Sequence, residues 1–208
     1  MIFSPKQTAR LPLRSPWAFL AHPSETYEPL GWLAMGPPSS HVRTSGNMPA
    51  PRWIPPPQGM MKINVDALFK NSSMAAVAAV ARDEAGIFQG ASALVVTGVS
   101  SPEIAEALAG REGLALARDL GMQRITIASD CVNVARSIQG PSMGLYGHIV
   151  REIKAEMTSF TKANFVHEGR NSNGDAHRIA RSSIYNDVGR YVWFIDPPDG
   201  VCTSYSAT

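Results

Sequence analysis

Proline constrains this chain more than any other residue type, because its distribution divides the sequence in two. Twelve of the sixteen prolines in the 208-residue chain lie before residue 58. Each proline fixes its own φ, removes a backbone donor and pushes the preceding residue toward extended conformations, so closely spaced prolines oppose both helices and central strands. We therefore predict a disordered or loosely ordered segment over residues 1–58, a packed domain over 60–185 and a C-terminal extension over 186–208.

The composition excludes several classes of protein. With 44% hydrophobic residues the chain can bury the core of one medium domain. Its net charge of +2 is too balanced to indicate nucleic-acid binding, so such a partner has to be inferred from a site. Cys131 and Cys202 form neither a disulfide framework nor a Cys-x-x-Cys metal motif, which predicts an intracellular protein. No apolar stretch reaches the roughly 18 residues that a membrane span needs, so no membrane partner is expected.

The first 24 residues contain three basic residues and no acidic one. This composition resembles an organelle transit peptide, although two prolines interrupt the amphipathic helix of a mitochondrial signal. The compartment is therefore not predicted beyond intracellular, with organelle targeting as an alternative.

Regular hydrophobic periodicity begins at Met60. Residues 62–69 alternate, and this predicts a strand with Asp66 on its polar face. The further elements predicted, in chain order, are strands over 74–81 and 87–96, a helix between Ser101 and Gly121, a strand over 124–129, a short helix capped by Asp130, a helix over 145–160, a strand over 163–167 and a helix over 173–184. The alanine run over 74–81 is also compatible with a helix. The order predicts an α/β fold with a five-stranded mixed sheet, three antiparallel strands followed by two parallel ones, flanked by helices.

Three acids lie where these elements converge. Asp66 is in the middle of the first strand of the domain, and Asp130 ends the fourth, at the edge where an α/β sheet usually binds ligands. Glu106 shares a helix face with Gly110 and Gly113, and such small residues let a helix approach a sheet closely. We therefore expect Glu106 to point toward the sheet.

Three clustered carboxylates need a counter-charge, because two of them 4 Å apart repel by about 4 kcal/mol at an effective dielectric of 20. Ligands that offer only oxygen suit Mg²⁺ or Mn²⁺ better than zinc, and two such ions can position an attacking water and stabilise the leaving oxygen of a phosphodiester. Spacing alone is equally consistent with three unrelated acids: a strand-edge acid at 66, a helix-dipole acid at 106 and an N-cap at 130.

Four blocks of the sequence resemble, in the right order, those of the type 1 ribonuclease H domain. They are KINVDA at 62–67, AEALA at 105–109 with EGL at 112–114, ASD at 128–130, and FVH at 165–167 with Arg170, Asn173, Ala176 and His177. The chain is most similar to the plant reverse-transcriptase-like branch, which is found in or derived from non-LTR retroelements. The resemblance covers residues 60–185.

The resemblance implies a ribonuclease H-like fold and a hydrolase, an endonuclease that cuts the RNA strand of an RNA–DNA hybrid. Asp66, Glu106 and Asp130 correspond to its metal ligands for Mg²⁺ or Mn²⁺, and His177 stands where active enzymes carry a fourth acid. A histidine there can bind metal or orient water but brings no negative charge. The nucleic-acid hybrid is the implied partner, and protein partners are not predicted. Contacts to 2′-hydroxyls and the minor groove are expected from Asn64, Asn71, Ser72, Arg170 and Asn173.

Two alternatives remain at this point. The replacement of the fourth acid by His177 is also consistent with a catalytically impaired nucleic-acid-binding domain derived from a retroelement, because Asp175 lies on nearly the opposite helical face and is a poor substitute. The apolar run over 191–195 either packs against the domain or binds a protein partner, and packing is the stronger expectation.

Overall fold

The computed structural model describes residues 8–11, 53–70, 73–141 and 145–205. Within them, seven strands form one mixed sheet in the order β1-β7-β4-β3-β2-β5-β6. The strands are β1 (Thr8–Leu11), β2 (Met61–Lys70), β3 (Met74–Arg82), β4 (Phe88–Thr97), β5 (Arg124–Ser129), β6 (Lys162–His167) and β7 (Gly189–Trp193). The helices are α1 (Pro102–Asp119), α2 (Val132–Gln139), α3 (Gly147–Met157) and α4 (Gly174–Ser183), with a short 3-10 turn at Arg170–Ser172.

The five predicted strands and their directions, three antiparallel and two parallel, are confirmed. Strands β2, β3 and β4 form the antiparallel part, while β5 pairs with β2 and β6 pairs with β5 in parallel. The alanine run of β3 is a strand, because its residues pair on both sides with the longer strands β2 and β4.

The predicted number of strands is too low by two. Strand β7 comes from the predicted C-terminal extension and pairs antiparallel with the outer edge of β4, so the run over 191–195 packs against the domain. Strand β1 comes from the Pro-rich segment and pairs with β7. The rest of that segment up to Arg52 lies outside the described residues. Open sheet edges offer unpaired backbone groups, and β7 covers the edge of β4 in this way.

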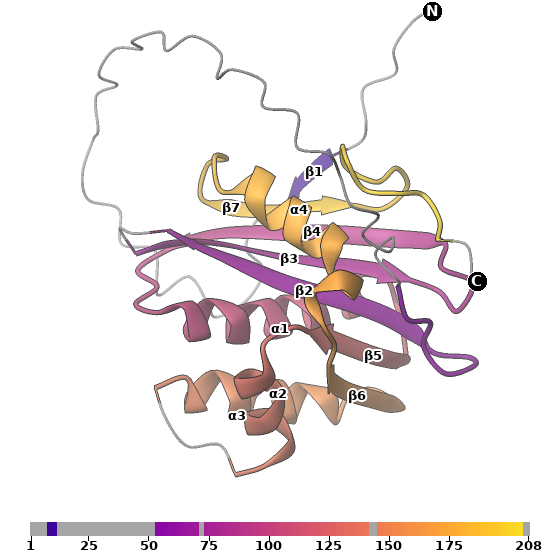
Figure 1. Ribbon diagram of the computed structural model, residues 1–208, viewed down its shortest axis with the longest axis horizontal. Helices are drawn as coiled ribbons and strands as arrows, with labels where there is room; N and C mark the ends of the chain where they lie inside the picture. Colours follow the sequence, from indigo (N-terminus) through magenta and orange to yellow (C-terminus); the bar gives the residue numbers. More distant parts are fainter. Residues whose placement is uncertain (1–7, 12–52, 71–72, 142–144, 206–208) are drawn as a thin grey trace, which may run out of the picture.

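Alternate residues of β2 and β3 face two separate hydrophobic cores. Ile63, Val65 and Val77 belong to the core that contains the buried face of α1. Ala78 and Val80 belong to the core that contains residues of α4. Figure 1 shows α1 and α4 on opposite sides of these central strands. Because Asp66 alternates with Val65, its side chain lies on the α4 side.

Local signals set the start of α1 as predicted, but not that of α2. Ser101 accepts a hydrogen bond from the backbone N–H of Ile104 at 3.3 Å, and Pro102 occupies the first turn of α1. The predicted cap of α2 by Asp130 is wrong, because Cys131 is the N-cap residue and makes no side-chain cap bond. The carboxylate of Asp130 is directed to other partners, described below.

The small face of α1 approaches the sheet as expected. A Cβ added to Gly113 would lie 2.8 Å from Cγ1 of Val65 and 3.2 Å from Cδ1 of Ile127, both on buried strands. Close packing therefore outweighs the helix-propensity cost of a glycine, which is about 1 kcal/mol.

We expect Gly113→Ala to lower the free energy of unfolding by about 1–3 kcal/mol, because the β-branched Val65 cannot move aside without disturbing the core. Urea unfolding of the two proteins measures this. Gly169→Ala is the control, since a Cβ there meets nothing within 4 Å and should change stability by less than about 0.5 kcal/mol. Equal effects at the two positions would contradict the close approach.

Among the described residues, no helix has both the length and the apolar character that crossing a membrane requires.

Candidate functional site

The register of the sheet brings Asp66 and Asp130 together. The parallel ladder between β2 and β5 ends with the pair Val65 and Ser129, and each of these two residues is followed directly by an aspartate. Glu106 reaches the same place from α1. One carboxylate oxygen from each of the three residues lies within 4.8 Å of the others. The predicted meeting of the three acids is therefore confirmed.

Glu106 is the member of this carboxylate cluster whose charge is least compensated. Its Oε2 is buried and has no hydrogen-bond partner among the described residues. The pKa of Glu106 is raised to about 8, mainly by burial and additionally by the nearby Asp66 and Asp130 carboxylates. Without a cation, burial and the two neighbouring carboxylates thus favour the protonated form of Glu106.

Asp66 is buried and pairs with His177, the fourth of the predicted site residues. Its Oδ2 lies 2.7 Å from Nδ1 of His177, which comes from α4 and is about one-third exposed. Burial raises the pKa of Asp66, with a further increase from Asp130, while the His177 contact acts in the opposite direction. His177 thus belongs to the site through a direct contact with Asp66.

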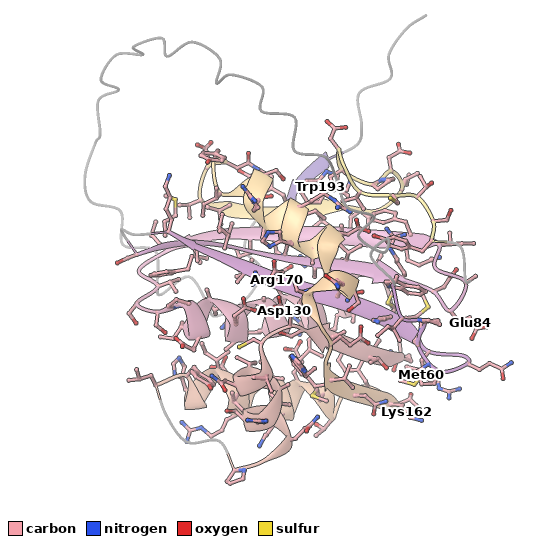
Figure 2. The ribbon with its side chains drawn as sticks, viewed as in Figure 1. Met60, Glu84, Asp130, Lys162, Arg170 and Trp193 are labelled. Atoms are coloured by element: carbon pink, nitrogen blue, oxygen red, sulfur yellow. The ribbon has the colours of Figure 1, made fainter. Side chains whose placement is uncertain are left out.

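Asp130 pairs with the exposed side chain of Arg170. Nε of Arg170 donates to Oδ2 of Asp130 over 3.1 Å, and 78% of the Arg170 side chain is exposed. The two residues lie next to each other in Figure 2. The hydrogen bond with Asp130 raises the pKa of the guanidinium. Arg170 therefore places a positive charge beside the carboxylates, on a side chain that solvent and ligands can reach.

The cluster fits a hard divalent cation. It offers carboxylate oxygens from three separate parts of the chain. Glu106, one of the three residues, also has a buried oxygen, Oε2, with no donor among the described residues. Mg²⁺ and Mn²⁺ prefer such ligands, whereas zinc sites in proteins generally include nitrogen or sulfur. A bound cation would also offset the repulsion from Asp66 and Asp130, which adds to the effect of burial on the pKa of Glu106.

The other predicted substrate contacts fall in three places. Arg170 is exposed at the site, and Asn71 and Ser72 lie outside the described residues. Asn64 and Asn173 are buried, which contradicts their prediction as groove donors. Oδ1 of Asn64 accepts from the indole of Trp53 at 3.2 Å, and Nδ2 of Asn173 donates to the backbone carbonyl of Val65 at 2.8 Å.

Both asparagines were misassigned because a polar side chain on a strand or before a helix looks the same in sequence whether its partner is substrate or protein. In the structure, Asn173 is the residue before α4, and its hydrogen bond to Val65 ties the start of this helix to β2, next to Asp66. This contact holds α4 and β2 together beside the site.

Buried ion pairs near the site were not predicted. Lys62 is 1% exposed and forms a salt bridge with Glu168 at 2.5 Å, while Arg82 pairs with Asp175 at 2.6 Å. The only sequence signal was the position of Lys62 on the same polar side of β2 as Asp66. Asp175, paired with Arg82, is not part of the carboxylate cluster.

The sheet order around β4-β3-β2-β5-β6 and the acids at its central strands define a protein with the ribonuclease H-like fold. The structure is similar to that of RNase H1 from the archaeon Halobacterium salinarum, with a TM-score of 0.55 and 19% sequence identity over 62% of this chain and 100% of that one. It is also similar to LC11-RNase H1 in complex with an RNA/DNA hybrid, with a TM-score of 0.54 and 18% identity over 60% and 96% of the two chains. The RNase H domain of a Mycobacterium tuberculosis protein gives a TM-score of 0.54 with 19% identity over 60% and 93%.

Residues 64–183 match the family described as reverse transcriptase-like. The chain therefore belongs to this family, and its domain is a type 1 ribonuclease H domain of the retroelement-like kind. No curated protein matches its sequence.

Proposed function

We propose that the chain is a metal-dependent endonuclease that hydrolyses the RNA strand of RNA–DNA hybrids. The observation that carries the proposal is the meeting of Asp66, Glu106 and Asp130, with one buried oxygen that has no protein partner. Family membership supports it, and so does the likeness of the fold to an RNase H1 that was solved with an RNA/DNA hybrid.

The three carboxylates would hold Mg²⁺ or Mn²⁺, which when bound supplies a Lewis acid that activates water and stabilises the leaving oxygen. Arg170, exposed beside Asp130, would bind a phosphate of the substrate strand through charge-assisted hydrogen bonds. His177 would hold the Asp66 carboxylate in a fixed orientation through the contact at Nδ1. The nucleic-acid hybrid is thus the proposed partner.

Cleavage of an end-labelled RNA–DNA hybrid in Mg²⁺ tests the proposal. We expect a ladder of shortened RNA from the wild-type protein and none when the metal is chelated. Asp66→Asn should lower the rate at least about 100-fold, because it removes a charged ligand. Asp196→Asn is the matched control, as Asp196 is exposed and lies outside the carboxylate cluster. A clean wild-type protein without metal-dependent product would refute the proposal.

A second candidate is a nucleic-acid-binding domain of retroelement origin that does not cleave. It is favoured by one observation, namely that two of the three acids already have protein partners, Asp66 with His177 and Asp130 with Arg170. Fluorescence anisotropy of the same hybrid separates the candidates, since tight binding without any product supports the second one.

A further inference from the structure

The beginning of α4 is held by a buried arginine from β3. Arg82 is 2% exposed, and its Nη2 donates to Oδ2 of Asp175 at 2.6 Å and to the carbonyl oxygen of Cys202 at 2.7 Å. Its Nη1 donates to the carbonyl oxygen of Gly86 at 3.0 Å. Arg82 therefore joins α4, the turn between β3 and β4, and the C-terminal residues of the chain at one point.

The C-terminal residues close over this arginine. The ring of Tyr205 lies 4.5 Å from the Arg82 guanidinium, and the ring of Trp53 stacks on Tyr205 with centroids 6.0 Å apart and planes inclined by 8°. The pKa of Tyr205 is raised to about 12, mainly by burial and next by a hydrogen bond to Asp175. We call Trp53, Arg82, Asp175 and Tyr205 the clasp.

Backbone contacts fix the tail in this place. The N–H of Phe88 donates to the carbonyl oxygen of Thr203 at 2.9 Å, and the N–H of Tyr205 donates to that of Gly86 at 3.1 Å. A Cβ at Gly86 would lie only 2.7 Å from the carbonyl oxygen of Tyr205, so the glycine permits the approach. Residues 202–205, the tail, are thus packed against the domain.

Helix α4 connects the clasp with the site. Asp175 is in the first turn of this helix, two residues before His177, and Asn173 just before the helix is tied to β2. The first turn is therefore anchored to β3 on one side and to β2 on the other. His177 follows on the same helix, and its Nδ1 lies 2.7 Å from Oδ2 of Asp66.

We propose that the clasp positions His177 against Asp66, so that Tyr205 and Arg82 are positioning residues for the site. The inference rests on the proposed function in so far as His177 serves the reaction. Trp53 and Tyr205 both lie outside residues 64–183, which match the family. The flanks of this chain thus supply a support that the matched region does not contain.

Two variants of Tyr205 test the inference. Tyr205→Ala removes both the ring and the hydroxyl, and we expect kcat on a labelled hybrid to fall about 10-fold while KM stays within about twofold, because a displaced group lowers the rate without weakening substrate binding. Tyr205→Phe keeps the ring stack and should lie within about threefold of the wild type. The ¹⁵N signal of the His177 imidazole, assigned with His177→Gln, is recorded for each metal-free protein. It should move strongly in Tyr205→Ala and in the same direction, but less, in Tyr205→Phe.

Ile153→Val is the control, because Ile153 is fully buried on α3, which carries none of the site residues. It should lower stability without moving the His177 signal or kcat. An unchanged His177 signal in both Tyr205 variants would overturn the inference, as would an equal change in Ile153→Val. If Tyr205→Ala fails to fold, the signal in Tyr205→Phe decides. If the wild type does not cleave, the proposed function fails but the His177 signal still tests the clasp.

Discussion

Replacing Glu106 by glutamine is expected to abolish cleavage and to stabilise the metal-free protein. The pKa of Glu106 is raised from 4.5 to about 8, so between these values the folded state binds a proton that the unfolded state has lost. Stability therefore falls as pH rises from about 4.5 to about 8, and remains low above that. Glutamine removes this penalty. The free energy of unfolding of the Glu106→Gln protein should exceed that of the wild type by about 2 kcal/mol or more at pH 9. The two values should be nearly equal at pH 4.

Activity should change in the opposite direction. Glu106→Gln removes one of three charged ligands, and we expect cleavage to fall at least about 100-fold. In the wild type, the affinity for Mg²⁺ or Mn²⁺ should rise with pH up to about 8, because metal binding requires Glu106 to lose its proton. Calorimetry in buffers of different ionisation enthalpy measures the proton release.

Glu103→Gln is the matched control for both measurements, because Glu103 lies in the exposed first turn of the same helix. It should leave cleavage and the pH dependence of stability unchanged. A Glu106→Gln protein that is less stable than the wild type at pH 9 would show that the carboxylate is not held in an unfavourable environment.

Removing the arginine of the clasp should cause the largest loss of stability. Arg82→Ala removes the buried partner of Asp175 and leaves this carboxylate only its ion pair with the partly exposed Arg178. Breaking a buried pair costs about 3–5 kcal/mol. Urea unfolding at neutral pH measures the loss. Arg118→Ala is the control, because Arg118 is 56% exposed in its pair with Glu156 and should cost less than about 1 kcal/mol.

A double-mutant cycle separates the ion pair from the packing of the arginine. If the Arg82–Asp175 pair dominates, the double variant Arg82→Ala/Asp175→Ala should be less destabilised than the sum of the two single variants, with an interaction energy of about 1–3 kcal/mol. Strict additivity would show that Arg82 acts through its contacts with Tyr205 and the tail alone.

Sequence patterns predicted the elements that depend on short-range physics. Alternation over 62–69 gave the central strand, since polar and apolar residues must face different environments across a sheet. Ser101 and Pro102 marked the start of α1, since cap residues satisfy the first backbone donors of a helix. The same reasoning failed at Asp130, where the acid is drawn to Arg170 and not to the backbone of α2.

Local sequence patterns did not predict which distant segments pair with each other. Strand β7 follows α4 and yet pairs with β4, because β4 offers an unpaired edge that only the assembled sheet reveals. Asn64 and Asn173 carried no signal that distinguishes a substrate contact from a contact with Trp53 or Val65. Burial decided between them, and burial depends on the whole packed domain.

The sequence by itself determined which three acids meet at the site, because Asp66, Glu106 and Asp130 are placed by the local alternation, by a small helix face and by a strand end. The tertiary structure alone decided the partner of each acid. Asp66 meets His177, Asp130 meets Arg170, and Glu106 has a buried oxygen with no partner. The reason is physical: a carboxylate's charge state depends on burial and on groups within a few ångströms, and those groups come from elements far apart in the chain.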